Sequence, residues 1–307
     1  MIATIRAGRR SIQISRPDKV LIPPGISKAA LASYYEAVAP AMLRHVTRRP
    51  LNFERYPDGI EGQRIFQQHA AKHFPDWIAQ VEVPAKRGNV KHVMAGDAAT
   101  LVYLAGQACI TFHAWLSRSD SLRRPDRLVI DLDPSTENAD EVRRAALSIG
   151  AMLRELELAP WAMTSGSRGY HVVVPLQRRL DFDDVREFAR GLAELATARE
   201  PRVFTTEQRK AKRDGKILID VLRNAYAHTS VAPYAVRARP GAPVATPLYW
   251  EELEDSATTP RRFTLESVPQ RLEAGEDPWR LIGSGARSLT RSRKLLREAL
   301  EESRGAR

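Results

Sequence analysis

The clearest pattern along the chain is a set of short apolar runs of strand length that carry acidic side chains. Residues 127–133 read Arg-Leu-Val-Ile-Asp-Leu-Asp, and Pro134, which cannot extend a β-ladder, follows directly. The run therefore predicts a buried strand. Because successive strand side chains alternate between the two faces, Asp131 and Asp133 are expected on one face, with their apolar neighbours on the other.

Elsewhere the spacing of apolar positions switches between the helical period and strand alternation. Ser27 is a typical N-cap, and the apolar residues after it predict a helix over residues 28–46. Further helices are predicted over 136–158 and 183–198 and near residues 265 and 288, and strands over 11–15, 49–56, 161–164, 171–175, 217–222 and 234–239. No repeat or low-complexity linker interrupts this order, which favours one compact α/β unit built from two modules.

Asp131, Asp133 and Asp220, the last in the apolar run 217–222, form the strongest chemical signal in the sequence. Carboxylates that are close together and partly removed from water repel each other, and each tends to hold a proton. A divalent cation removes this penalty, and carboxylate oxygens are the ligands that Mg²⁺ and Mn²⁺ prefer. The structural alternative is a pair of capping or loop aspartates at the edge of a sheet, and the third aspartate counts against it.

The charge balance points to a polyanionic partner. The 307 residues include 48 Lys and Arg against 37 Asp and Glu, for a formal net charge of +11. Such an excess favours nucleic acid, because each neutralised phosphate releases counterions. Basic residues are concentrated in residues 202–216, directly before Asp220. This position favours a phosphate or nucleic-acid surface over an ordinary solvated face.

The only cysteine, Cys109, excludes an intrachain disulfide and a multi-cysteine zinc site. It lies in an apolar segment and is predicted to be a small buried hydrophobe rather than a nucleophile. No apolar stretch approaches the roughly 20 residues that span a bilayer. The first residues lack the apolar core of a signal peptide, so a cytoplasmic location without membrane contact is expected.

Residues 164–171, Thr-Ser-Gly-Ser-Arg-Gly-Tyr-His, are predicted to form a turn between two strands. Glycines and small side chains let backbone N–H groups approach a phosphate, and Ser165, Ser167, Arg168 and His171 add further donors. A plain hairpin is the alternative. The position of the turn, between the first two aspartates and the third, favours the functional interpretation.

Arg237 and Arg239 are predicted on one face of the strand 234–239. Two such guanidinium groups repel unless an anion lies between them, and a triphosphate can accept bidentate hydrogen bonds from both. An acidic structural partner is the alternative. Together, carboxylates that hold one or two divalent ions and donors that hold a triphosphate are typical of nucleotidyl transfer, in which the metal aligns a hydroxyl with the α-phosphate.

The motifs, in their order along the chain, resemble the archaeo-eukaryotic primase superfamily and, more narrowly, the polymerase domain of bacterial ATP-dependent DNA ligase D. The resemblance covers nearly the whole chain. It rests on Asp18-Lys19-Val-Leu-Ile-Pro, Ser27-Lys28, Arg55-Tyr-Pro-Asp-Gly, His113-Ala-Trp-Leu-Ser-Arg, Val-Ile-Asp131-Leu-Asp133-Pro, Thr-Ser165-Gly-Ser-Arg-Gly-Tyr-His171-Val, Asp220-Val-Leu-Arg-Asn224 and Ala232-Pro-Tyr-Ala-Val-Arg237-Ala-Arg239-Pro-Gly-Ala-Pro-Val.

The resemblance implies an archaeo-eukaryotic primase fold, in which two tightly packed α/β modules, one RRM-like, surround a central active-site cleft. Residues 1–307 would form a single catalytic domain that no linker divides. The implied roles are metal binding and catalysis by Asp131, Asp133 and Asp220, nucleotide contacts from His113, Ser165, Ser167, Arg168, His171, Arg237 and Arg239, binding of a DNA 5′-phosphate by Lys19 and Lys28, and template contacts from Arg55 and Phe66.

The sequence departs from the family pattern at two positions. Paired aromatic residues are frequent where this chain has Ile65 and Phe66, so stacking on a template base would fall to Phe66. Arg168 stands where lysine is common, which keeps the charge. No ligase lysine motif is present, so the chain is expected to be a stand-alone polymerase or an isolated domain.

The resulting hypothesis is a template-dependent polymerase that adds NTPs or dNTPs to 3′ ends and fills short gaps with a 5′-phosphate during non-homologous end joining. The resemblance implies a Mn²⁺ preference, with Mg²⁺ as the alternative, and a DNA ligase and the end-binding protein Ku as partners. Three other functions stay open: a primase or primase-polymerase of replication or excision repair, an Asp-x-Asp phosphohydrolase with Asp131 as nucleophile, and a non-catalytic DNA-end-binding module.

Overall fold

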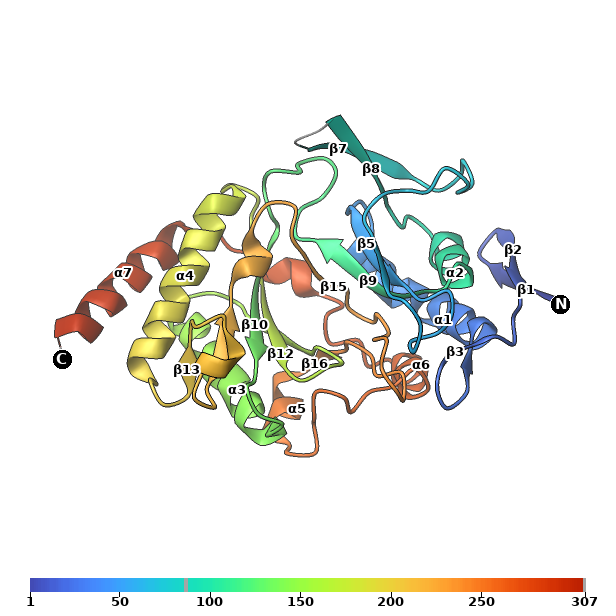
Figure 1. Cartoon of the computed structure of the whole chain (residues 1–307). Helices are drawn as coiled ribbons and strands as arrows, with labels where there is room; N and C mark the ends of the chain where they lie inside the picture. The colour runs from blue at the N-terminus through green and yellow to red at the C-terminus, as the bar shows by residue number, and fades with distance from the viewer. Residues whose placement is uncertain (86–87, 306–307) are drawn as a thin grey trace. The chain divides into compact units, whose positions relative to one another are not determined.

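The computed structural model describes residues 1–85 and 88–305 and has mixed α/β structure (Figure 1). The chain divides into two compact units, each assembled from three separate stretches. Unit 1 contains Met1–Asp120, Val231–Thr246 and Phe263–Arg280, and unit 2 contains Ser121–Ser230, Pro247–Arg262 and Leu281–Arg307. Two modules were predicted, and their interleaving along the chain fits the absence of a simple linker. That they act as one inseparable domain stays a prediction.

Unit 1 is built around a sheet in the order β15-β9-β5-β8-β7, in which β6 also pairs with β5. Two helices, α1 and α2, pack against each other beside it. The elements are β1 (Ile2–Ala7), β2 (Arg10–Ser15), β3 (Val20–Ile22), β4 (Ile26–Ser27), α1 (Lys28–Val46), β5 (Leu51–Arg55), β6 (Ile65–Gln67), β7 (Gln80–Ala85), β8 (Gly88–Val93), α2 (Ala98–Gly106), β9 (Cys109–Trp115) and α6 (Ser267–Glu273). Strand β15 (Thr229–Val231) lies where the chain passes from unit 2 to unit 1.

The predicted helix 28–46 is confirmed, with the N-cap where the sequence placed it. The Ser27 side chain accepts a hydrogen bond from the Ala30 N–H at 3.1 Å, which satisfies one of the unpaired donors of the first turn. Cys109 is fully buried at the start of β9, and burial raises the pKa of its thiol to about 12. The prediction of a structural rather than a nucleophilic cysteine agrees with this environment.

Unit 2 is built on a six-stranded sheet in the order β13-β14-β10-β12-β11-β16. Helix α3 packs against β10, β11 and β12, whereas α4 packs against β10, β13 and α7. The elements are β10 (Arg127–Asp133), α3 (Ala139–Glu155), β11 (Trp161–Thr164), β12 (Tyr170–Pro175), α4 (Phe182–Arg199), β13 (Phe204–Thr205), the 3-10 helix η1 (Lys210–Lys212), β14 (Ile217–Asp220), η2 (Leu222–Asn224), β16 (Pro247–Leu248), α5 (Trp250–Glu254), η3 (Ile282–Gly285) and α7 (Leu289–Gly305).

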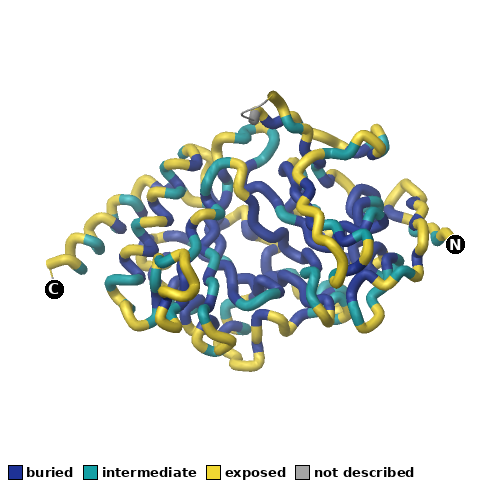
Figure 2. Tube along the Cα trace, in the orientation of Figure 1, coloured by how far each residue is buried: buried dark blue, intermediate teal, exposed yellow. Residues whose placement is uncertain are grey.

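The central strand β10 has the alternation that its sequence predicted. Ile130 and Leu132 are fully buried, while Asp131 and Asp133 are only partly buried on the opposite face. In Figure 2 the buried colour follows the central strands of each unit, and exposed residues concentrate on loops and the outer sides of helices. The apolar face therefore supplies the core of unit 2, and the carboxylates face away from it.

The side chain of Asn224 continues the ladder beside β10 after β14 has ended. Its Oδ1 accepts a hydrogen bond from the Val129 N–H at 2.9 Å, and its Nδ2 donates to the Val129 carbonyl oxygen at 2.7 Å. The amide thus replaces a backbone partner for this part of the strand. Asn224 is fully buried. Its two hydrogen bonds with Val129 therefore hold the segment that follows Asp220 in place against β10.

Two predicted elements need correction. The helix predicted from residue 136 begins at Ala139, because the Asn138 side chain caps it by accepting from the N–H groups of Asp140 and Glu141. The predicted strand 234–239 was wrong. Tyr234 has a positive φ of 67°, and the segment forms turns with one isolated bridge, Val236 to Val244.

Tertiary hydrogen bonds explain why residues 234–239 leave strand geometry. Tyr34 on α1 donates its hydroxyl to the Tyr234 carbonyl oxygen at 2.8 Å, and the Val236 N–H donates to the Tyr35 hydroxyl at 3.0 Å. These side-chain partners replace a neighbouring strand and outweigh the local preference of the alternating sequence. Among the residues described, no helix combines the length and the apolar character needed to cross a bilayer.

Candidate active site

The register of three strands in unit 2 gathers the predicted acidic residues. Asp131 in β10 lies directly opposite Asp220 in the antiparallel strand β14, and opposite His171 in β12 on its other side. Directly paired residues in an antiparallel sheet point to the same face, as do residues two apart in one strand. Asp131, Asp133 and Asp220 are therefore on one face of the sheet.

Asp131 is paired with one histidine and one arginine. Its Oδ1 lies 3.4 Å from His171 Nε2, and its Oδ2 accepts a hydrogen bond from Arg223 Nε at 3.4 Å. Burial alone would raise the pKa of Asp131, but His171 and Arg223 outweigh it and lower the pKa to about 2. Asp131 is therefore ionised at neutral pH and offers anionic oxygen ligands.

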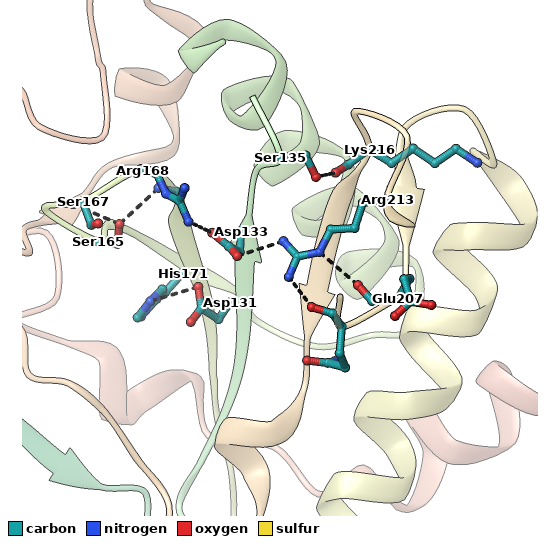
Figure 3. Close-up of polar contacts among 12 residues, drawn as sticks. Asp131, Asp133, Ser135, Ser165, Ser167, Arg168, His171, Glu207, Arg213 and Lys216 are labelled. Carbon is teal, nitrogen blue, oxygen red and sulfur yellow. Dashed lines mark hydrogen bonds and ion pairs between the residues drawn. The ribbon is translucent and has the colours of Figure 1, made fainter. Parts of the chain in front are cut away.

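Two guanidinium groups hold Asp133, one on each carboxylate oxygen (Figure 3). Arg168 Nη2 donates to Oδ1 at 3.0 Å, and Arg213 Nη1 donates to Oδ2 at 2.9 Å. Arg213 is only 5% exposed, and its other N–H groups donate to the carbonyl oxygens of Glu207 and Gln208. The basic segment before Asp220 is thus attached to β10 by one buried arginine.

The environment of Asp220 raises the pKa of its carboxyl group, whereas the environment of Asp131 lowers it. Burial raises the pKa of Asp220, and the charges of Asp131 and Asp133 raise it further, although the Leu222 N–H donates to Oδ1 at 2.8 Å. A carboxylate whose proton affinity is raised by like charges gains most from a nearby cation.

The donor set suits a divalent cation, although the side chains are not arranged as a finished metal centre. Asp131 and Asp220 face each other across one strand pair, where burial and the like charges of Asp131 and Asp133 raise the pKa of Asp220. Over residues 1–85 and 88–305, no three His, Cys, Asp or Glu side chains converge closely enough to hold an ion. Instead arginines and His171 neutralise Asp131 and Asp133, so binding a cation requires some of these ion pairs to open.

Replacing Asp220 with asparagine is expected to stabilise the metal-free protein. The amide oxygen can still accept the Leu222 N–H, while repulsion from Asp131 and Asp133 disappears. A carboxyl whose folded pKa is raised contributes stability at low pH that is lost as pH rises. The gain should therefore be on the order of 1 kcal/mol at neutral pH and shrink toward zero near pH 4.

Thermal unfolding in the presence of a chelator, at pH 7.5 and at pH 4.5, measures this gain. Asp183→Asn, an exposed carboxylate in the first turn of α4, is the matched control and should leave the Tm nearly unchanged. Added Mn²⁺ should stabilise the wild-type protein more than Asp220→Asn. A Tm at pH 7.5 that is equal to or lower than that of the wild type would contradict the proposed repulsion.

The predicted turn between β11 and β12 is confirmed and is organised by Ser165. The Ser165 Oγ accepts hydrogen bonds from the N–H groups of Ser167 and Gly169, both at 3.2 Å. Gly166 has a φ of +62°, which favours glycine. Gly169 is required for a second reason, because a Cβ there would lie 1.8 Å from the Leu132 carbonyl oxygen. The turn is thus held tightly against the strand that carries Asp131 and Asp133.

His171 is almost fully buried between two partners. Its Nε2 faces Asp131, while Nδ1 lies 3.2 Å from the Ser230 hydroxyl. In this structure His171 therefore orients Asp131. Of the four predicted nucleotide-contact residues of the turn, Arg168 and His171 contact the acidic residues directly, and Ser165 and Ser167 shape the loop.

In unit 1, the residues predicted to bind a DNA 5′-phosphate lie in a cluster of cations. Burial lowers the pKa of Lys28, and the charges of Arg16, Lys19 and Arg55 lower it further. Lys28 Nζ donates to the Ser15 carbonyl oxygen at 2.9 Å, and Lys19 Nζ donates to Asp58 at 2.8 Å. Four neighbouring positive charges, one of them partly desolvated, form a surface suited to a phosphate.

His113, Phe66 and Arg237 are associated with one buried carboxylate, Glu54. His113 Nε2 lies 3.3 Å from Glu54 Oε1, and the rings of Phe66 and His113 meet edge to face with centroids 5.9 Å apart. Arg237 is close enough for its charge to lower the pKa of Glu54. Arg239 follows in the same turn segment, so its side-chain direction does not derive from strand alternation.

Sequence reasoning missed Arg213, Arg223 and Glu54. Arg213 was part of the basic run before Asp220, but nothing in that run distinguished it from the exposed cations around it. Arg223 follows the third aspartate within the same motif. Glu54 reads as an ordinary strand residue. Its position inside an apolar strand, with an arginine at 55 and a tyrosine at 56, was the one available signal.

A family model described as the LigD primase-polymerase domain matches residues 27–279. The chain is 38% identical over 279 residues to the multifunctional non-homologous end joining protein LigD of Pseudomonas aeruginosa, covering 89% of this chain and 33% of that protein. It is 30% identical over 266 residues to the protein of the same description from Mycolicibacterium smegmatis, covering 85% and 35%.

A solved structure, described as the polymerase domain from Mycobacterium tuberculosis ligase D in complex with DNA, matches with a TM-score of 0.84 and 27% identity. The match covers 90% of this chain and 99% of that chain. This chain therefore spans about a third of the length of these two curated relatives but nearly the whole of a solved polymerase domain.

Proposed function

We propose, on the premise that this chain belongs to the LigD primase-polymerase domain family, that it is a template-dependent nucleotidyltransferase that extends 3′ ends at DNA double-strand breaks. It would add NTPs or dNTPs and fill short gaps next to a 5′-phosphate. The register that sets Asp131 opposite Asp220, with Asp133 on the same strand face, is the observation that carries the proposal. It supplies the acidic face that a cation-dependent transfer requires.

In this proposal Asp131, Asp133 and Asp220 hold one or two divalent ions, with Mn²⁺ preferred over Mg²⁺. The ions supply charge neutralisation and alignment of the 3′-hydroxyl with the α-phosphate. Asp220 helps to accept the proton of that hydroxyl. His171 and Arg168, which neutralise the aspartates here, would be released to contact the triphosphate if cations took their place.

Other residues would bind the triphosphate and the DNA. Ser165 and Ser167 in the turn, together with His113, Arg237 and Arg239 of unit 1, complete the nucleotide contacts. Lys19 and Lys28 bind the 5′-phosphate of the downstream strand, and the cation cluster around Lys28 supports this role. Arg55 and Phe66 contact the template. A DNA ligase and the end-binding protein Ku are the proposed partners, at the nucleoid in the cytoplasm.

A two-part nucleotide-incorporation experiment tests the proposed function. The protein is incubated with labelled UTP and Mn²⁺, first without template and then with a gapped duplex that carries a 5′-phosphate. Primer extension only in the second reaction, greater with the 5′-phosphate than with a 5′-hydroxyl, is the expected result. Release of inorganic phosphate from phosphoesters without any primer would favour a phosphohydrolase. DNA binding without extension would indicate a non-catalytic end-binding module.

A further inference from the structure

Two large apolar side chains lie exposed next to each other on the short strand β6 of unit 1. Ile65 is 41% exposed and Phe66 is 42% exposed, whereas the next residue, Gln67, is buried and anchors the strand by accepting a hydrogen bond from Arg55. Because successive strand side chains point to opposite faces, only Phe66 shares a face with its cross-strand partner Glu54, and this face marks the candidate binding surface.

An arginine lies on this surface in a defined position. The guanidinium carbon of Arg64 is 5.5 Å from the centroid of the Phe66 ring, and its Nη2 is 3.5 Å from Glu54 Oε1. The Arg64 side chain remains 54% exposed. One side of the guanidinium is thus supported by an aromatic ring, while the group as a whole stays accessible from solvent.

Glu54 is the residue that fixes this arrangement. It is 8% exposed on β5, directly opposite Phe66 in the strand register. His113 Nε2 lies 3.3 Å from one carboxylate oxygen, and the Tyr56 hydroxyl donates to the other at 3.4 Å. Burial alone would raise the pKa of Glu54, but His113, Arg64 and Arg237 lower it. Glu54 is therefore an ionised group that needs cations around it, and Arg64 is one of them.

We propose that Arg64, held against Phe66 by Glu54, is a further nucleic-acid-binding residue that stacks on an unpaired nucleobase. A planar guanidinium backed by an aromatic ring is suited to the flat face of a base, and it adds a charge for the nearby phosphates. The net charge of +11 favours a polyanionic occupant, and the ring-backed, exposed guanidinium favours a nucleic acid, because its bases offer flat faces. Arg64 would thereby enlarge the stacking surface that Phe66 provides, and Glu54 would be a positioning residue.

The proposal rests on the proposed function, and equilibrium DNA binding without nucleotide tests it separately. The probe is a fluorescent duplex with a 5′-phosphate and a 3′ single-stranded overhang, in which an abasic site replaces one overhang base at a time. The wild-type protein should lose affinity at one abasic position. Arg64→Ala should bind the intact overhang about tenfold more weakly and lose less affinity at that abasic position than the wild type, because only Phe66 still stacks there.

Two more variants separate stacking from charge. Arg64→Lys keeps the charge but has no planar group, so it should bind more weakly than the wild type and show the same reduced abasic sensitivity as Arg64→Ala. Glu54→Gln should weaken binding in the same base-dependent way, because Arg64 loses its anchor. Arg48→Ala is the matched control. The Arg48 side chain is 57% exposed and its Nη2 lies 3.6 Å from Asp120. The affinity of the Arg48→Ala variant for the probe should stay within about twofold of the wild-type affinity.

Binding by the Arg64 variants decides between a stacking role and a purely electrostatic role of this residue. The inference would be overturned if Arg64→Lys bound DNA with wild-type affinity. It would also be overturned if Arg64→Ala lost the same factor in affinity for intact and abasic overhangs, because Arg64 would then act only as a charge. If the wild-type protein extends primers while both Arg64 variants retain the abasic sensitivity of the wild type, the inference fails and the proposed function stands. If the wild-type protein neither binds nor extends DNA, both fail.

Discussion

Asp131→Ala is expected to abolish nucleotide addition, by at least about 10³-fold, while DNA binding is largely retained. Asp131 occupies the centre of the acidic face, opposite Asp220 on one side and His171 on the other. Its removal takes away a metal ligand and leaves His171 and Arg223 without their carboxylate partner. Primer extension with Mn²⁺ and anisotropy with the same DNA measure the two properties.

Asp131→Asn separates the loss of charge from the loss of side-chain volume. It keeps the shape of the side chain, so it should fold at least as well as Asp131→Ala and still fail to extend a primer. Asp133→Ala should also be inactive. Asp183→Ala, which removes an exposed carboxylate from the same unit, is the control and should extend normally. Extension at the wild-type rate by Asp131→Ala or Asp133→Ala would remove the catalytic assignment.

The second large effect is expected from Gly169→Ala. An added Cβ would lie 1.8 Å from the Leu132 carbonyl oxygen and 3.0 Å from its carbonyl carbon. Because these are backbone atoms of the central strand, neither can rotate away, and β10 and β12 must separate. The expected cost is about 3 kcal/mol or more of unfolding free energy. Urea unfolding followed by circular dichroism measures it.

Gly283→Ala is the matched control, because nothing lies within 4 Å of a Cβ at that position in the same unit. Its unfolding free energy should stay within about 0.5 kcal/mol of the wild type. Gly169→Ala should also lose extension, since the separated strands move His171 away from Asp131. An unfolding midpoint equal to that of Gly283→Ala would show that the two strands tolerate a side chain there.

The sequence by itself determined the features that depend on neighbouring residues. Alternation along residues 127–133 placed Asp131 and Asp133 on one face, because strand geometry repeats every second residue. Ser27 marked the start of α1, because a hydroxyl before an apolar helical pattern satisfies the first N–H groups. The order of the motifs also indicated the family, to which the whole-chain comparisons assign the chain.

Only the tertiary structure decided which distant residues meet. The register between β10 and β14 sets Asp220 opposite Asp131, whereas the alternation in each strand predicts only which face a side chain takes, not which residue of the other strand lies opposite it. The same holds for Arg213, which is one cation among many in its segment until the fold buries it beside Asp133. The segment around Tyr234 reads as a strand but forms turns, because hydrogen bonds from the α1 tyrosines outweigh its local preference. Such contacts depend on chain segments far apart in sequence, and no local pattern encodes them.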